Sequence, residues 1–234
     1  MSKLFILVMM FLLITGSMAA ERRSIRDIDI DAITKDTQVS PAGAGDEHVA
    51  FVWWVPIEFW QSILARDENT SERDKKATLD ALSGSSLIAI VQADVSSLGA
   101  FKFYSKDEVE KNMHVSFTNA GGEHQRLRPV QVLAPDLEVV LGVFKPLLSA
   151  AMGNLGANMH FYVFDDQGEA KPRLLDPYRK GVISVQLTKN DKEIMIADVE
   201  LPLNALFVPR KCPNGKEAHV SWNYCPWSGK QLEE

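Results

Sequence analysis

Three histidines and a glutamate offer the acid–base chemistry that is easiest to see in this sequence. His114 and the pair Glu123-His124 lie on either side of a glycine turn, and His160 follows further along the chain. A base and a carboxylate that approach each other in this way can transfer protons or hold a metal ion. We therefore take His114, Glu123, His124 and His160 as candidates for a polar site. The alternative is a set of unrelated surface histidines, which is the commoner arrangement in proteins.

A second candidate site is centred on Glu58, which lies within a run of aromatic residues. The members of this run are Phe51, Trp53, Trp54, Phe59 and Trp60. Aromatic ring faces can stack on the apolar side of a sugar, and a nearby carboxylate can act as acid or base in glycoside hydrolysis. In this interpretation Trp54 and Phe59 form a binding surface and Glu58 is the catalytic group. The alternative is core packing, because successive residues of a strand point to opposite faces.

The common catalytic motifs are absent from the sequence. It contains no Gly-x-Ser-x-Gly elbow, no His-Glu-x-x-His pair and no Gly-x-x-x-x-Gly-Lys-Ser/Thr phosphate loop. Arg173 and Asp176 are expected to fix a turn, either by a local ion pair or by an Asp-Pro turn start. These observations favour a binding role over an enzymatic one, and they predict no cofactor.

Composition and charge describe an ordinary globular protein. The 234 residues are 46% hydrophobic and 24% charged, which excludes a disordered or collagen-like chain. Lys and Arg number 25 against 31 Asp and Glu, so the formal net charge is −6. Because nucleic-acid backbones are bound by clustered Lys and Arg, this balance argues against a nucleic-acid partner.

The first residues have the features of a secretory signal peptide. Lys3 precedes an unbroken apolar run at residues 4–14, and small residues follow at Ser17 and Ala19. The run is shorter than the ~20 residues that a transmembrane helix needs. We therefore expect cleavage after Ala19, no stable membrane span in the mature protein, and a periplasmic or secreted location. An uncleaved anchor is the alternative, because arginines soon after the cleavage site oppose translocation.

Composition divides the remaining chain into three parts. Residues 20–48 are polar and rich in small side chains, so we expect a flexible arm or linker there, although Ile28, Ile30 and Ile33 could add an edge strand. Apolar segments recur through residues 49–208, which predicts a single domain of ordinary size. Residues 209–234 form a separate tail that contains both cysteines.

The pattern within residues 49–208 predicts an α+β fold with a mostly antiparallel sheet. A β-sandwich with helical insertions is the alternative. The expected strands lie at about 49–55, 87–95, 101–104, 114–118, 126–133, 160–164, 181–188 and 193–201. The expected helices lie at about 57–66, 71–84, 106–112 and 135–152.

Two stretches of the tail repeat one pattern, Cys212-Pro213-Asn214-Gly215-Lys216 and Cys225-Pro226-Trp227-Ser228-Gly229-Lys230. Each stretch resembles the knuckle of a zinc ribbon, in which Cys-Pro-x-Cys-Gly turns the backbone so that two thiolates face one metal ion. The resemblance covers about residues 210–231 and describes a degenerate double knuckle, since the second cysteine of each copy is missing.

The missing cysteines change what the tail can do. Structural zinc needs four ligands, and the tail provides only Cys212, His219 and Cys225, which leaves zinc as a minor alternative. Two thiols in an oxidising compartment form a disulfide instead. We therefore expect a ribbon-like tail cross-linked between Cys212 and Cys225, with a stabilisation of about 3 kcal/mol in the chain-entropy model.

These expectations together describe an exported, non-enzymatic binding or envelope-assembly module. Its partner would be another protein or a cell-surface polymer. The alternative function is a cell-wall or carbohydrate hydrolase that uses Glu58 beside the tryptophan-rich segment.

Overall fold

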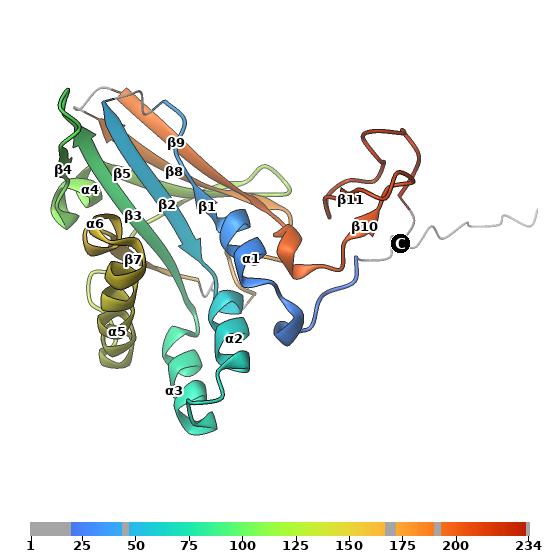
Figure 1. Ribbon diagram of the computed structural model, residues 1–234, viewed down its shortest axis with the longest axis horizontal. Helices are drawn as coiled ribbons and strands as arrows, with labels where there is room; N and C mark the ends of the chain where they lie inside the picture. Colours follow the sequence, from blue (N-terminus) through green and yellow to red (C-terminus); the bar gives the residue numbers. More distant parts are fainter. Residues whose placement is uncertain (1–19, 44–46, 167–171, 190–192, 233–234) are drawn as a thin grey trace, which may run out of the picture.

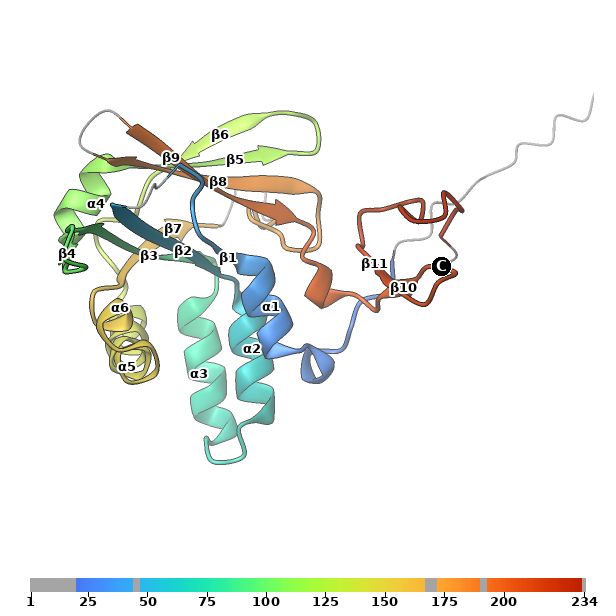
Figure 2. The same cartoon turned by 45° about the horizontal axis from the view of Figure 1, so that its top comes forward.

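Two large antiparallel sheets and a layer of helices form the main body of the described structure, and a separate two-stranded sheet lies in the tail (Figures 1 and 2). The computed structural model describes residues 20–43, 47–166, 172–189 and 193–232. The sheets face each other, and the longer helices cover the outer face of the first sheet. This arrangement confirms the α+β class with antiparallel sheets. Among the described residues, no helix is both long and apolar enough to cross a membrane.

The first sheet is built around a long central strand. Its strands are β1 (Gln38–Val39), β2 (His48–Val55), β3 (Ser85–Val95), β4 (Phe101–Phe103) and β7 (His160–Asp165). One edge of β3 pairs with β2 over the whole length of β2, and the other edge pairs with β7 and β4. Eight consecutive residues of β3, 86–93, are buried. Helices cover one face of β3 and the second sheet covers the other (Figure 2). The sequence of β3 is therefore continuously apolar and does not alternate.

The second sheet has one buried face and one exposed face. Its strands are β5 (Met113–Asn119), β6 (His124–Leu127), β8 (Gly181–Lys189) and β9 (Glu193–Leu201), in the order β6-β5-β8-β9. Alternate residues of β8, such as Ile183, Val185 and Leu187, are buried toward the first sheet. Their neighbours along the strand are partly exposed, as the period of two in a strand requires.

Four helices pack on the first sheet, α1 (Ile30–Thr37), α2 (Ile57–Arg66), α3 (Glu72–Leu82) and α5 (Pro135–Met152). The shorter segments are the helices α4 (Lys106–Asn112) and α6 (Asn154–Ala157) and the 3-10 turns η1 (Ile25–Asp27) and η2 (Asn204–Leu206). Helix starts follow the local signals in the sequence. Ser105 and Glu108 form a reciprocal capping box at α4, and Ser71 caps α3.

Residues 20–43 belong to the folded core, which corrects the expectation of a flexible arm at 20–48. Ile28 and Ile33 are fully buried in the main hydrophobic cluster. The segment has too few apolar residues to fold alone, but it buries those few against the rest of the domain. Composition describes only what a segment can do by itself, so it missed this contribution.

The start of this segment is paired with a region near the other end of the chain. Main-chain hydrogen bonds join residues 21–23 to residues 206–208, with N–O distances of 2.8 and 2.9 Å. In addition, the main-chain N–H of Ala205 donates to Asp36 Oδ2 at 2.7 Å. Burial raises the pKa of the Asp36 carboxyl, and the hydrogen bond from Ala205 opposes this effect. The first and last parts of the domain therefore depend on each other.

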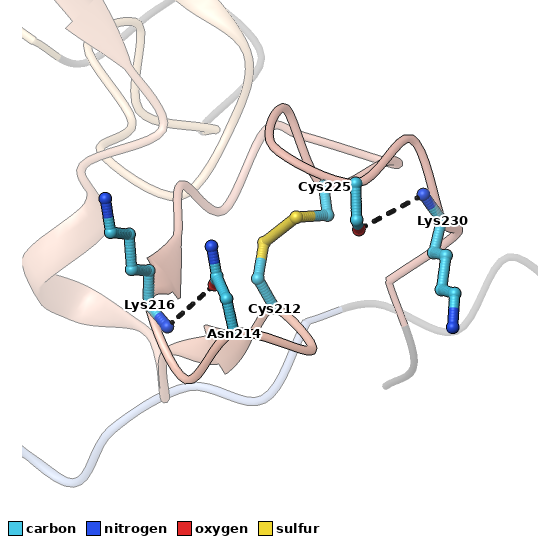
Figure 3. Close-up of a disulfide and its surroundings, with 6 residues drawn as sticks. Cys212, Asn214, Lys216, Cys225 and Lys230 are labelled. Carbon is cyan, nitrogen blue, oxygen red and sulfur yellow. Dashed lines mark hydrogen bonds between the residues drawn. A yellow bond between two sulfur atoms is a disulfide. The ribbon is translucent and has the colours of Figure 1, made fainter.

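The tail contains the predicted disulfide between Cys212 and Cys225 (Figure 3). It also contains the short strands β10 (Arg210–Lys211) and β11 (Glu217–Ala218) and a small buried cluster of its own. No group of three or more His, Cys, Asp or Glu among the described residues could hold a metal ion. The resemblance to a zinc ribbon was therefore wrong, because disulfide-bonded sulfurs are not available as thiolate ligands. His219 hydrogen-bonds to Ser221 Oγ at 2.7 Å.

Candidate functional site

A pocket of about 870 Å³ lies beside the β5–β6 hairpin. Its base is apolar and includes Phe117, Leu127 and Phe164, which are all buried. The hairpin forms one wall, and the loop over residues 172–180, which leads into β8, forms another. The pairing of β5 with β8 brings these two distant segments together.

Positive charge is concentrated around this pocket. The described residues that line it include the cations Arg126, Arg128, Arg173, Arg179 and Lys180, and the acids Asp165 and Asp176. Over the whole chain acids outnumber Lys and Arg by 31 to 25. The pocket therefore has a local excess of positive charge in a protein of net negative charge.

Three of these cations have no partner in the described part of the chain. Arg128, Arg179 and Lys180 are exposed, and their side chains make no hydrogen bond or ion pair with another described residue. Arg126 differs, because its Nη2 lies 2.7 Å from His114 Nδ1 across the hairpin. Arg173 differs as well, because two carboxylates hold its guanidinium.

The guanidinium of Arg173 is fixed by Glu58 and Asp166 at the side of the pocket. Its Nη1 donates to Glu58 Oε1 at 2.6 Å, and its Nε donates to Asp166 Oδ2 at 3.2 Å. Glu58 lies in the first turn of α2, and Asp166 directly follows β7. Asp166 Oδ1 also accepts a hydrogen bond from the main-chain N–H of Leu175 at 2.6 Å. This network positions the loop that forms one wall of the pocket.

Burial controls the ionisation of this network. It raises the pKa of Glu58 and of Asp166, and the neighbouring Arg173 opposes the increase with a smaller effect. Burial also lowers the pKa of Arg173, but the two carboxylates together outweigh that effect and raise it overall. Glu58 Oε2 is buried and has no hydrogen-bond partner among the described residues, which adds to the cost of its negative charge.

The sequence suggested a local ion pair between Arg173 and Asp176. In the structure Arg173 pairs with Glu58 and Asp166. Arg173 instead reaches Glu58, 115 residues earlier in the sequence. Asp176 starts the turn, as the Asp-Pro interpretation expected, because its Oδ1 accepts from the main-chain N–H of Tyr178 at 2.9 Å.

Trp54 and Phe59 do not form a surface, although the aromatic cluster had suggested one. Trp54 is 0% exposed, and its Nε1 donates to Ser86 Oγ at 2.6 Å. Phe59 is buried on the helical side of the sheet, where its ring packs edge-to-face against Trp53 at 5.2 Å between centroids. Both faces of β2 are covered, so Trp54 and Phe59 pack in the core, as the alternative interpretation of the aromatic cluster expected.

The histidine and glutamate candidates do not come together in one cluster. The structure gives them separate partners, in the pairs His114–Arg126, Glu123–Asn119, His124–Thr118 and His160–Tyr104. Three of the candidates, His114, Glu123 and His124, lie on the exposed β5–β6 hairpin. His160 lies half-buried on β7. Burial lowers the pKa of His160, which favours its neutral form.

Sequence reasoning missed the residues that define the pocket. Arg128 and Arg179 lie far apart in the sequence, and only strand pairing brings their segments together. The sequence does contain a signal for a basic pocket. Two short basic groups each follow a turn, Arg126-Leu127-Arg128 and Arg179-Lys180.

Comparison with protein-family models, with curated proteins and with solved structures finds no match to this chain. The geometry and charge of the pocket are therefore the basis on which a function can be proposed.

Proposed function

We propose that this protein is an exported binding protein that takes a small organic anion into the cation-lined pocket. The observation that carries the proposal is an apolar base beside three unpartnered cations, Arg128, Arg179 and Lys180, in the described part of the chain. The apolar part of such a ligand would be removed from water when it packs against the apolar base of the pocket, which favours binding. A carboxylate, sulfonate or phosphate group of the same ligand would accept charge-assisted hydrogen bonds from the cations.

Two observations support an extracytoplasmic location. Disulfides persist in oxidising compartments, and the Cys212–Cys225 bridge is present. The signal-peptide pattern at residues 1–19 supports the same location, and those residues lie outside the described ones. Intact mass of the protein recovered from the periplasm or medium checks this part of the proposal, and we expect a mass that lacks residues 1–19.

The alternative function as a carbohydrate hydrolase draws no support from the residues that suggested it. Glu58 is 4% exposed and is paired with Arg173. Trp54 has no ring face open to a sugar, since it lies in the core. A binding role is therefore the better-supported proposal.

Two fluorescent probes that differ by one charged group test the anion pocket. The probes are 8-anilinonaphthalene-1-sulfonate and N-phenyl-1-naphthylamine, which has the same aromatic body without the sulfonate. We expect Arg128→Gln/Arg179→Gln to weaken sulfonate binding about tenfold, since two partly solvated charge contacts contribute about 1.4 kcal/mol together. Binding of the neutral probe should change less than about twofold, and added salt should reduce the difference between the probes.

Lys102→Gln/Lys111→Gln is the matched control for the loss of two positive charges. Lys102 and Lys111 are exposed and do not line the pocket. The control should retain sulfonate affinity within about twofold of the unmodified protein. Equal weakening in both double variants, or no weakening in the pocket variant, would overturn the proposal.

A further inference from the structure

Three large aromatic side chains are exposed within residues 222–227 of the tail. Trp222, Tyr224 and Trp227 are 39%, 61% and 50% exposed. The tail lies to one side of the two sheets, away from the helical layer (Figures 1 and 2). Aromatic side chains are mostly removed from water in folded proteins, and exposed groups of them mark binding surfaces.

The main chain of the tail holds these aromatic residues in a fixed arrangement. The Arg210 guanidinium donates to the main-chain oxygen of Trp222. Tyr224 forms an isolated antiparallel bridge with Gln231. The Cys212–Cys225 disulfide (Figure 3) closes the stretch of chain that contains Trp222 and Tyr224. Trp227 follows Cys225 by two residues. A surface that is already ordered loses little conformational entropy when a ligand binds.

The two tryptophan rings are neighbours but do not stack on each other. Their centroids are 6.1 Å apart and their planes are inclined by 73°. Lys216 Nζ lies 4.8 Å from the centre of the Trp227 ring and covers one of its faces. The His219 ring packs against Trp222 at 6.0 Å between centroids, and about half of the Trp227 surface remains exposed to a ligand.

The chemistry of this surface favours a carbohydrate. Within described residues 209–232, every exposed large hydrophobic side chain is aromatic. Aromatic faces suit the apolar C–H side of a pyranose, while polar neighbours can bond its hydroxyls. Exposed polar residues of the tail include Ser221, Asn223, Ser228 and Gln231. The exposed residues Val139, Val143 and Leu147 on α5 provide a contrast, because aliphatic side chains offer no flat face.

We propose that Trp222, Tyr224 and Trp227 form a second binding surface, which takes the pyranose rings of a neutral polysaccharide. The surface is separate from the anion pocket, and none of its aromatic residues lines that pocket. The proposal therefore goes beyond the proposed function and does not depend on it.

Calorimetric titration of the full mature protein with cellohexaose and with chitohexaose tests the carbohydrate surface. We expect at least one of these neutral hexasaccharides to bind. Trp222→Ala/Trp227→Ala should weaken that binding at least about tenfold, because stacked aromatic groups supply much of the contact. Phe101→Ala is the matched control, since Phe101 is an exposed aromatic residue on β4, and it should leave affinity within about twofold.

Two measurements separate loss of contact from loss of structure and from failure of the anion pocket. The urea midpoint of the double tryptophan variant should stay close to that of the unmodified protein, because both replaced side chains are partly exposed. Arg128→Gln/Arg179→Gln should bind the hexasaccharide normally. No binding of either hexasaccharide up to about 5 mM, or unchanged binding in the tryptophan variant, would overturn the proposal.

Discussion

Replacing Arg173 with Met will destabilise the protein by about 3 kcal/mol in urea unfolding near neutral pH. The substitution leaves Glu58 and Asp166 as buried carboxylates without their counter-charge. Loss of one partner from a buried ion pair costs about 3–5 kcal/mol. The lower end applies here because the Arg173 side chain is 30% exposed, so water screens part of the interaction.

The loss of stability in Arg173→Met will depend on pH, and the ionisation of the two carboxyl groups determines whether it grows or shrinks as the pH rises. Arg173 lowers the pKa of both carboxyls, so its removal raises both native pKa values further. A raised native pKa gives stability that is present below the unfolded-state value and is lost as the pH rises through the native value. The difference between Arg173→Met and the unmodified protein should therefore be larger at pH 8 than at pH 5. An equal difference at both pH values would contradict this assignment.

Two variants separate charge from packing in this prediction. The triple variant Glu58→Gln/Asp166→Asn/Arg173→Met removes all three charges at nearly constant volume, and it should recover most of the lost stability. Arg179→Met removes an exposed cation from the same loop, and it should leave the urea midpoint unchanged. If the triple variant were no more stable than the single one, buried charge would not be the cause.

Replacing Trp54 with Ala will destabilise the protein by about 3–5 kcal/mol, the range for a large aromatic residue in a core. Trp54 is fully buried and donates to Ser86, so truncation leaves both a cavity and an unpaired hydroxyl. Urea unfolding measures the effect, and Trp54→Phe should give a smaller loss because most of the volume remains.

Trp227→Ala is the control for this second prediction. Trp227 is half-exposed, so its truncation should change the unfolding free energy by less than about 0.5 kcal/mol. A Trp54→Ala protein with normal stability but impaired ligand binding would contradict the core position and would restore the idea of an aromatic surface at β2.

The sequence predicted most individual elements because their signals are local. Pro135 begins α5, and the Ser105 capping box begins α4. The apolar runs before Pro56 and near Gly181 become β2 and β8. These signals depend on residues within one or two turns, which is the scale that a single sequence reveals. The packing of residues 20–43 depends on distant residues, and for this reason it was missed.

The candidate site was less predictable because its residues meet only through tertiary structure. Glu58 was proposed as a catalytic acid or base beside the aromatic cluster, whereas its partner in the structure, Arg173, lies 115 residues away in the sequence. The exposure of Trp222 and Trp227 was missed for a related reason. Sequence composition suggests that tryptophan is buried, and only the folded tail shows that these two are open to solvent.

The pairing of residues 21–23 with residues 206–208 has a consequence for biogenesis. Contacts between segments so far apart in sequence form late, because the intervening chain must first be made and ordered. During synthesis, residues 21–23 must wait for residues 206–208 to be made before the hydrogen bonds between them can form. The first segment of the domain to be made is therefore among the last to reach its native structure.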